Sequence, residues 1–122
     1  MNDGYVRIED RETDRIAKQL SEAIARSDEY TAYRSALEEL QLKPELYEQV
    51  NSLRRQNFLS QNGEDGIMPY EEYQKLSVMS RNLRVNPLVS RFLDAEVGLG
   101  RLMQDINRNI ISGIDFDSDF LN

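Results

Sequence analysis

Apolar residues recur every three or four positions along most of this chain, the spacing that places them on one face of a helix. Stripes of this kind fill the segments 13–24, 30–40, 46–59 and 70–83, and a longer one begins at Pro87. The turn dipeptides of the segment 61–68 are not flanked by the alternating apolar and polar runs that a β-hairpin would need. The pattern therefore predicts an all-α fold of about five helices.

Local signals separate these helices. Ser27 with Asp28 is suited to cap the second helix, and Pro44 and Pro69 stand where the third and fourth begin. The segment 61–68 contains Asn-Gly and Asp-Gly, which are turn dipeptides, so it predicts the main loop of the chain. Asn86-Pro87 is a cap followed by proline at the first helical position, and it predicts the start of the fifth helix.

The fifth helix is expected to run from Pro87 to about Ser112, or roughly 39 Å at 1.5 Å per residue. A compact chain of this length is only about 35 Å across. Its apolar positions alternate spacings of four and three for nearly four heptads, which is typical of a coiled coil. The expected dimer or partner seam consists of Val89, Phe92, Glu96, Leu99, Met103, Ile106 and Ile110. We therefore expect a helical bundle that forms a homodimer through this helix.

Glu96 is the charged residue of that seam, between Phe92 and Leu99. A buried carboxylate is costly unless it is paired. One hypothesis is an ion pair with an arginine of another helix or chain, such as Arg84, Arg91 or Arg101. The other is that Glu96 lies at the rim of the seam.

The length of 122 residues fits a single domain. We expect a flexible arm over residues 1–11, one helical domain over 12–114, and a flexible acidic tail over 115–122. The longest apolar run is far too short to cross a bilayer, and the first residues do not resemble an export signal. A cytoplasmic protein without membrane insertion is expected.

The net charge of −7, from 22 acidic and 15 basic residues, argues against a duplex DNA-binding surface. The segment 73–114 is nevertheless basic, with 6 basic and 3 acidic residues. Its possible charged partner patch consists of Arg81, Arg84, Arg91, Arg101 and Arg108. The alternative is a solvated face neutralised by Asp94 and Asp105.

The chain contains no cysteine and no histidine. Thiolate metal sites, cysteine nucleophiles and imidazole catalysis are therefore excluded, and no cofactor, metal site or enzymatic activity is expected. The few lysines lie in no recognisable catalytic pattern. The tyrosine pairs Tyr30–Tyr33 and Tyr70–Tyr73 have the spacing that could stack bases, but packing against the core is the favoured interpretation.

Two groups of residues form small signatures along the predicted helices. The first comprises residues 16–24, Ser27-Asp28-Glu29-Tyr30 with Tyr33, Leu40, and Pro44-Glu45-Leu46. The second comprises Gly63, Asn86-Pro87-Leu88-Val89, and Phe92-Leu93-Asp94-Ala95-Glu96 with Leu99, Leu102 and Ile106. In these signatures the chain resembles the YlbF/YmcA family over about residues 12–114.

This resemblance implies a small, helical, usually dimeric cytoplasmic regulator of Gram-positive bacteria. It implies a non-catalytic adaptor that joins other family members and a ribonuclease complex, assisting RNase Y in mRNA processing. Iron–sulfur clusters linked to some members need cysteines that this chain lacks. Direct RNA binding through the basic C-terminal half, or a purely structural role, are the alternatives.

Overall fold

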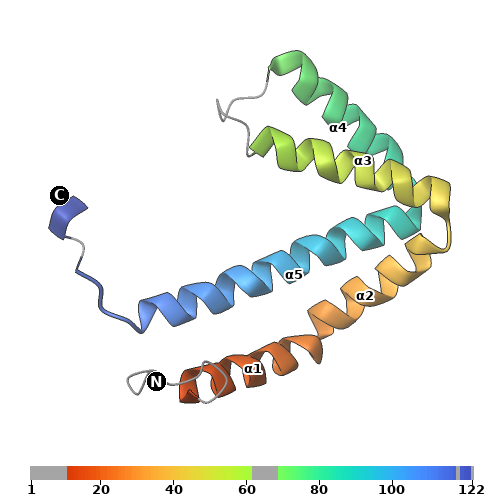
Figure 1. The fold of residues 1–122 in the computed structure, drawn as a ribbon. Coiled ribbons are helices and arrows are strands. Elements are labelled where there is room, and N and C mark those ends of the chain that lie inside the picture. The colour runs from red at the N-terminus through yellow and green to blue at the C-terminus, as the bar shows by residue number, and fades with distance from the viewer. Residues whose placement is uncertain (1–10, 62–68, 118, 122) are drawn as a thin grey trace, which may run out of the picture.

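The computed structural model describes residues 11–61, 69–117 and 119–121. It is all-α, as predicted (Figure 1). Within these ranges, five α-helices are followed by a short 3-10 turn, η2 (Asp119–Leu121). The α-helices are α1 (Glu12–Ala25), α2 (Asp28–Gln41), α3 (Pro44–Gln61), α4 (Tyr70–Arg84) and α5 (Pro87–Ser112). The arm expected at residues 1–11 lies outside the described residues apart from Arg11, and so does most of the loop expected at 61–68.

The helix starts follow the local signals of the sequence. The Ser27 hydroxyl accepts a hydrogen bond from the Tyr30 amide at 3.1 Å, which caps α2. The Asn86 side chain likewise accepts from the Leu88 amide at 2.9 Å, and Pro87 is the first residue of α5. Backbone amides left free at a helix start are thus satisfied by side chains that the sequence places there.

The core lies between α2, α3, α4 and α5. α2 and α5 make the most extensive contact of any helix pair, and they run side by side in Figure 1. The side chains with 0–1% exposure are Ala36, Leu40, Val50, Leu53, Val89 and Phe92. The Tyr33 ring packs on Phe92 with their centroids 5.6 Å apart. Burial of these apolar side chains is the main source of the fold's stability.

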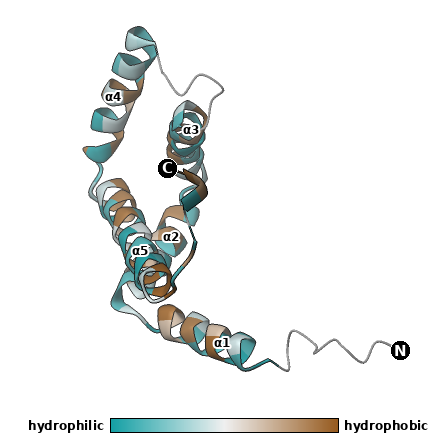
Figure 2. Ribbon diagram, turned by 90° about the vertical axis from the view of Figure 1, so that its left-hand side faces the viewer, coloured by the Kyte–Doolittle hydropathy of each residue, from teal (hydrophilic) through white to brown (hydrophobic). Residues whose placement is uncertain are grey.

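The helices are arranged openly around this core. The α3–α4 hairpin lies at the N-terminal end of α5, whereas α1 lies toward its C-terminal end (Figure 1). α1 packs on α2, yet none of its residues is buried. Figure 2 shows hydrophobic positions recurring along α1, well apart from α3 and α4. The two ends of the molecule therefore present separate surfaces.

Candidate partner-binding surfaces

The seam predicted along α5 divides into two parts. Val89 and Phe92 are completely buried within the single chain, where α2 covers them. They are core residues and are not available to a second copy, so the prediction is corrected for this part of the seam. The reason is that α2 packs along α5 and Arg54 of α3 lies over the Phe92 ring, an arrangement that the spacing within α5 does not reveal.

The second part of the seam remains accessible. Leu99 and Ile106 are half-buried, while Met103 and Ile110 are 45% and 49% exposed. At 100° per residue these positions continue the face of α5 that carries Phe92. An apolar face that is buried over the first half of α5 is thus only partly covered over the second half.

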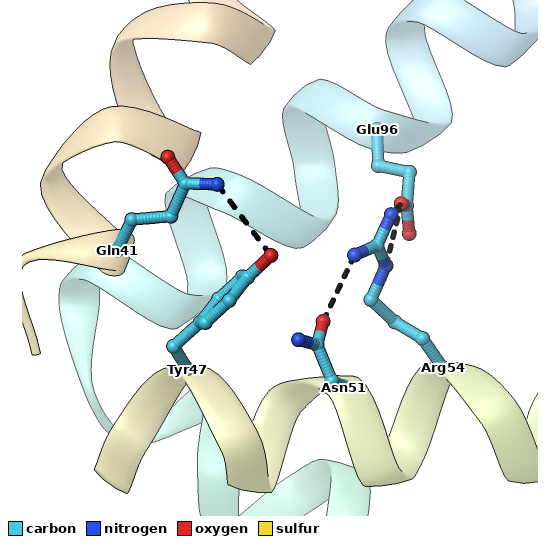
Figure 3. A network of polar contacts seen from close by, with 5 residues as sticks. All are labelled: Gln41, Tyr47, Asn51, Arg54 and Glu96. Atoms are coloured by element: carbon cyan, nitrogen blue, oxygen red, sulfur yellow. Dashed lines mark hydrogen bonds and ion pairs between the residues drawn. The ribbon is translucent and has the colours of Figure 1, made fainter. Parts of the chain in front are cut away.

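Glu96 lies where the two halves meet, and its partner is Arg54 of α3 (Figure 3). The Arg54 Nη2 and Nε atoms lie 2.7 and 2.9 Å from one Glu96 oxygen, Oε2. About a third of each side chain remains exposed. The hypothesis that Glu96 pairs with an arginine of another helix is therefore correct, but the arginine is Arg54 and not Arg84, Arg91 or Arg101. Glu96 is half-buried, so its environment lies between a buried seam position and an exposed rim position.

Arg54 connects several elements besides this ion pair. Its Nη1 donates to Asn51 Oδ1 at 3.0 Å, and its guanidinium carbon lies 5.1 Å from the centre of the Phe92 ring. The charge is thus held by a carboxylate, an amide and an aromatic face. Through these contacts Arg54 links α3 to α5.

Tyr47 belongs to the same polar row of α3 (Figure 3). Gln41 Nε2 donates to its hydroxyl at 3.5 Å. The hydrogen bond from Gln41, and a second from Asn51, lower the pKa of Tyr47 below its usual value of 10.0. The polar stripe on this face of α3 consists of Tyr47, Asn51 and Arg54, which are four and three residues apart in the sequence. That spacing shows that they share a face, but it does not show that Gln41 and Glu96 are the residues they contact.

Most of the predicted arginine patch is paired with acidic groups. Arg84 contacts Asp94 at 2.9 Å, and Arg108 contacts Asp105 at 3.0 Å. Arg91 forms an ion pair with Glu39 of α2. The remaining members, Arg81 and Arg101, are exposed. The neutralised-face interpretation therefore describes this surface better than a continuous cationic patch.

A groove between α3 and α4, here called the hairpin groove, was not predicted from the sequence. Its volume is about 940 Å³, within the usual range for binding sites. Its lining is formed by Gln49, Ser52, Glu71, Gln74, Lys75, Val78, Met79, Asn82 and Leu83. The apolar part of this lining comes from α4, the polar part from both helices.

The tyrosines of α4 do not pack as predicted. Tyr70 and Tyr73 are 72% and 60% exposed, because the start of α4 stands away from the core. In the α2 pair, Tyr33 packs on the core against Phe92, and Tyr30 stacks on Tyr33 with centroids 6.4 Å apart. Core packing is thus correct for Tyr33 and wrong for the α4 pair.

Among the residues that the structure describes, no helix is both long enough and apolar enough to cross a membrane. Within the same residues, no three histidine, cysteine, aspartate or glutamate side chains come together as a metal site.

Comparison with known families matches residues 14–115 to the family described as control of competence regulator ComK, YlbF/YmcA. This match covers all five helices of the described residues except the first two residues of α1. The chain belongs to the YlbF/YmcA family. The resemblance inferred from the sequence is thereby confirmed, and the description of the YlbF/YmcA family is one of regulators.

Curated relatives of this YlbF/YmcA chain carry the name UPF0342 protein. The one from Staphylococcus epidermidis is 26% identical over 101 residues, covering 81% of this chain and 89% of the relative. Those from Halothermothrix orenii and Caldicellulosiruptor bescii are 26% and 25% identical, over 82% and 83% of this chain and 86% and 87% of their own lengths. No solved structure matches this chain.

Proposed function

We propose that this chain is a non-catalytic regulatory adaptor that acts through protein–protein contacts. The observation that carries the proposal is the presence of two apolar surfaces at opposite ends of α5: the hairpin groove, and the partly covered C-terminal half of α5. An adaptor must bind two partners at once, which is possible when its two binding surfaces lie at separate places on the same chain. Exposed apolar patches of this kind mark interaction sites.

The partners expected from the family are other YlbF/YmcA proteins and a ribonuclease complex containing RNase Y. The hairpin groove is the surface we assign to such a partner. Its apolar side chains, including the 45% exposed Val78, lie beside polar groups that can accept and donate hydrogen bonds. Apolar centres with polar edges are the usual anatomy of protein interfaces.

Affinity purification of the tagged chain from its source bacterium tests the proposal. Wild type should recover a ribonuclease or other family members. Val78→Glu should lose them, because it places a charge among the apolar side chains of the groove. Ser77→Glu is the matched control, since it adds the same charge at the neighbouring exposed position of α4, outside the lining. Recovery of the chain alone, or equal recovery by both variants, would contradict the proposal.

Direct RNA binding predicts a different result. Cationic surfaces release counterions when they bind phosphates, so their affinity falls steeply as salt is raised. Arg84, Arg91 and Arg108 are already paired with acidic residues. We therefore expect the chain to bind RNA only weakly, even at low salt. Fluorescence anisotropy with labelled single-stranded RNA over a salt series measures this. Tight RNA binding whose affinity falls steeply with salt would contradict the adaptor proposal and favour a function in direct RNA binding.

A further inference from the structure

The segment that follows α5 is both acidic and apolar. We call residues 115–117 and 119–121 the C-terminal tail. Its acidic side chains are Asp115, Asp117 and Asp119, and its apolar ones, which are between 62% and 80% exposed, are Phe116, Phe120 and Leu121. Large apolar side chains gain stability when they leave water. The family match ends at residue 115, so all but the first residue of the tail lies outside the region that the chain shares with the YlbF/YmcA family.

A second groove lies between α3 and α5 and is here called the α3–α5 groove. Its volume is about 730 Å³, and Leu59 and Val97 of its lining are 66% and 48% exposed. The charged residues of the lining are Arg54, Arg55 and Glu96, which leaves a net positive charge. Arg55 pairs with Glu48 in an exposed contact, and such pairs are weak, so Arg55 remains available to another anion. The groove is therefore both apolar and cationic.

One face of α5 joins this groove to the tail. Val97, Gln104 and Ile111 are seven residues apart, so they lie along one line of the helix. A Cβ atom at Gly100, beside this line, would meet nothing within 4 Å, so the surface there is open. Arg101, one turn after Val97, is exposed and forms no ion pair with any residue that the structure describes. The line thus offers an open path with a free cation.

The tail is long enough to reach the groove along this line. Val97 lies sixteen residues before Gly113, a distance of about 24 Å along the helix. The eight residues from Ile114 to Leu121 span about 26–29 Å when extended. Figures 1 and 2 both show the C-terminal end on the side of α5 where α3 lies. A chain reversal at Gly113 therefore brings Phe120 and Leu121 level with Val97.

We infer that the α3–α5 groove is a binding site for an acidic, aromatic peptide, and that the tail of the same chain is its occupant, folded back along α5. The aspartates of the tail then face Arg101, Arg54 and Arg55, and this pairing of opposite charges selects the acidic tail. Phe120 and Leu121 meet the apolar part of the lining. A short tether gives the tail an effective concentration of about millimolar, which favours it over the tail of another copy. A groove filled in this way is closed to other acidic peptides until the tail leaves it.

This inference does not depend on the proposed function. The hairpin groove shares no lining residue with the α3–α5 groove. Met103 and Ile110, on the accessible apolar face of α5, each lie about 100° around the helix from the neighbouring residues Gln104 and Ile111 of the line. The tail and its groove are therefore a separate surface.

The chain has no cysteine, so two introduced thiols can report the position of the tail. Val97→Cys with Phe120→Cys should form an intrachain disulfide under mild oxidation, several-fold faster than Gly98→Cys with Phe120→Cys. Gly98 is the matched control because it is the next residue, about 100° around α5, and a Cβ atom there would meet nothing within 4 Å. Equal rates for the two pairs, or disulfides that form chiefly between chains, would overturn the inference.

The chain also has no tryptophan, so Phe120→Trp reports the surroundings of the tail by fluorescence. Its emission should lie at a shorter wavelength than that of a water-exposed indole and should not depend on protein concentration. Arg101→Glu in this background should shift the emission toward that of an exposed indole, because the new carboxylate repels the aspartates of the tail. Arg81→Glu is the matched control, since Arg81 is an exposed arginine of α4 outside the groove lining.

Three results of the fluorescence experiment count against the inference. The first is an exposed indole in Phe120→Trp itself, and the second is an emission that changes with protein concentration. The third is an equal shift for Arg101→Glu and Arg81→Glu. Each would show that the tail does not occupy the α3–α5 groove of its own chain.

Discussion

Arg54 and Glu96 join α3 to α5 across 42 residues of sequence, with Nη2 and Oε2 2.7 Å apart. Both side chains keep about a third of their surface in water. The pair therefore has an environment between that of an exposed ion pair and that of a fully buried one, and its contribution to stability should lie between theirs.

Removing the Glu96 carboxylate tests this intermediate environment. Glu96→Gln should lower the free energy of unfolding by about 1–2 kcal/mol, between the about 0–1 of surface pairs and the about 3–5 of broken buried pairs. Urea melts at fixed protein concentration measure the change. Asp94→Asn is the control, because the Arg84–Asp94 pair is more exposed and its loss should cost about 1 kcal/mol or less. Equal effects of the two substitutions would show that Glu96 behaves as an ordinary surface charge.

Truncating Phe92 tests its assignment to the core of the single chain. Phe92→Ala should cost about 3–5 kcal/mol of unfolding free energy, because the ring is completely buried. Val85→Ala alters an apolar residue just before α5 that is 80% exposed, and should change stability by about 0.5 kcal/mol or less. Urea melts of both variants at one fixed protein concentration measure the changes. A mild effect of Phe92→Ala would contradict the core assignment.

Gly100 offers a stabilising substitution within α5. A Cβ atom built at this position meets nothing within 4 Å. Alanine loses less backbone entropy than glycine in a helix, so Gly100→Ala should stabilise the chain by about 0.5–1 kcal/mol. Thermal melts of wild type and Gly100→Ala at one fixed protein concentration measure the gain. Destabilisation by Gly100→Ala would contradict the open surroundings of this position.

The Tyr47 hydroxyl should titrate earlier than an ordinary phenol, because the hydrogen bonds from Gln41 and Asn51 lower its pKa from 10.0. Ultraviolet titration of wild type minus Tyr47→Phe isolates its phenolate signal. Gln41→Ala should move the titration back toward 10.0. Since the folded pKa is the lower one, the group favours folding as pH rises through that pKa toward 10.0, and this contribution disappears as pH falls below it. An unshifted titration would show that the Gln41 contact is not formed in solution.

The positions of the helices followed from residues close together in the sequence. Ser27, Pro44 and Asn86-Pro87 mark helix starts through hydrogen bonds or dihedral preferences that extend over only a few residues. Helical hydrogen bonding is itself local, so the apolar spacing was sufficient to predict five helices and the length of α5.

The neighbours of each face were decided by the tertiary structure. The spacing of α5 shows one continuous apolar stripe, yet the packing of α2 along α5 buries its first half and leaves the second half partly open. The sequence indicated that Glu96 needs a cationic partner but offered several arginines. The tertiary structure places Arg54 of α3 beside it. Tyr33 and Tyr73 follow similar patterns, but only Tyr33 reaches the core, since α2 lies along α5 whereas α4 stands away at its start. A periodic pattern specifies which side chains share a face, but the helix that covers that face depends on contacts between segments far apart in the chain.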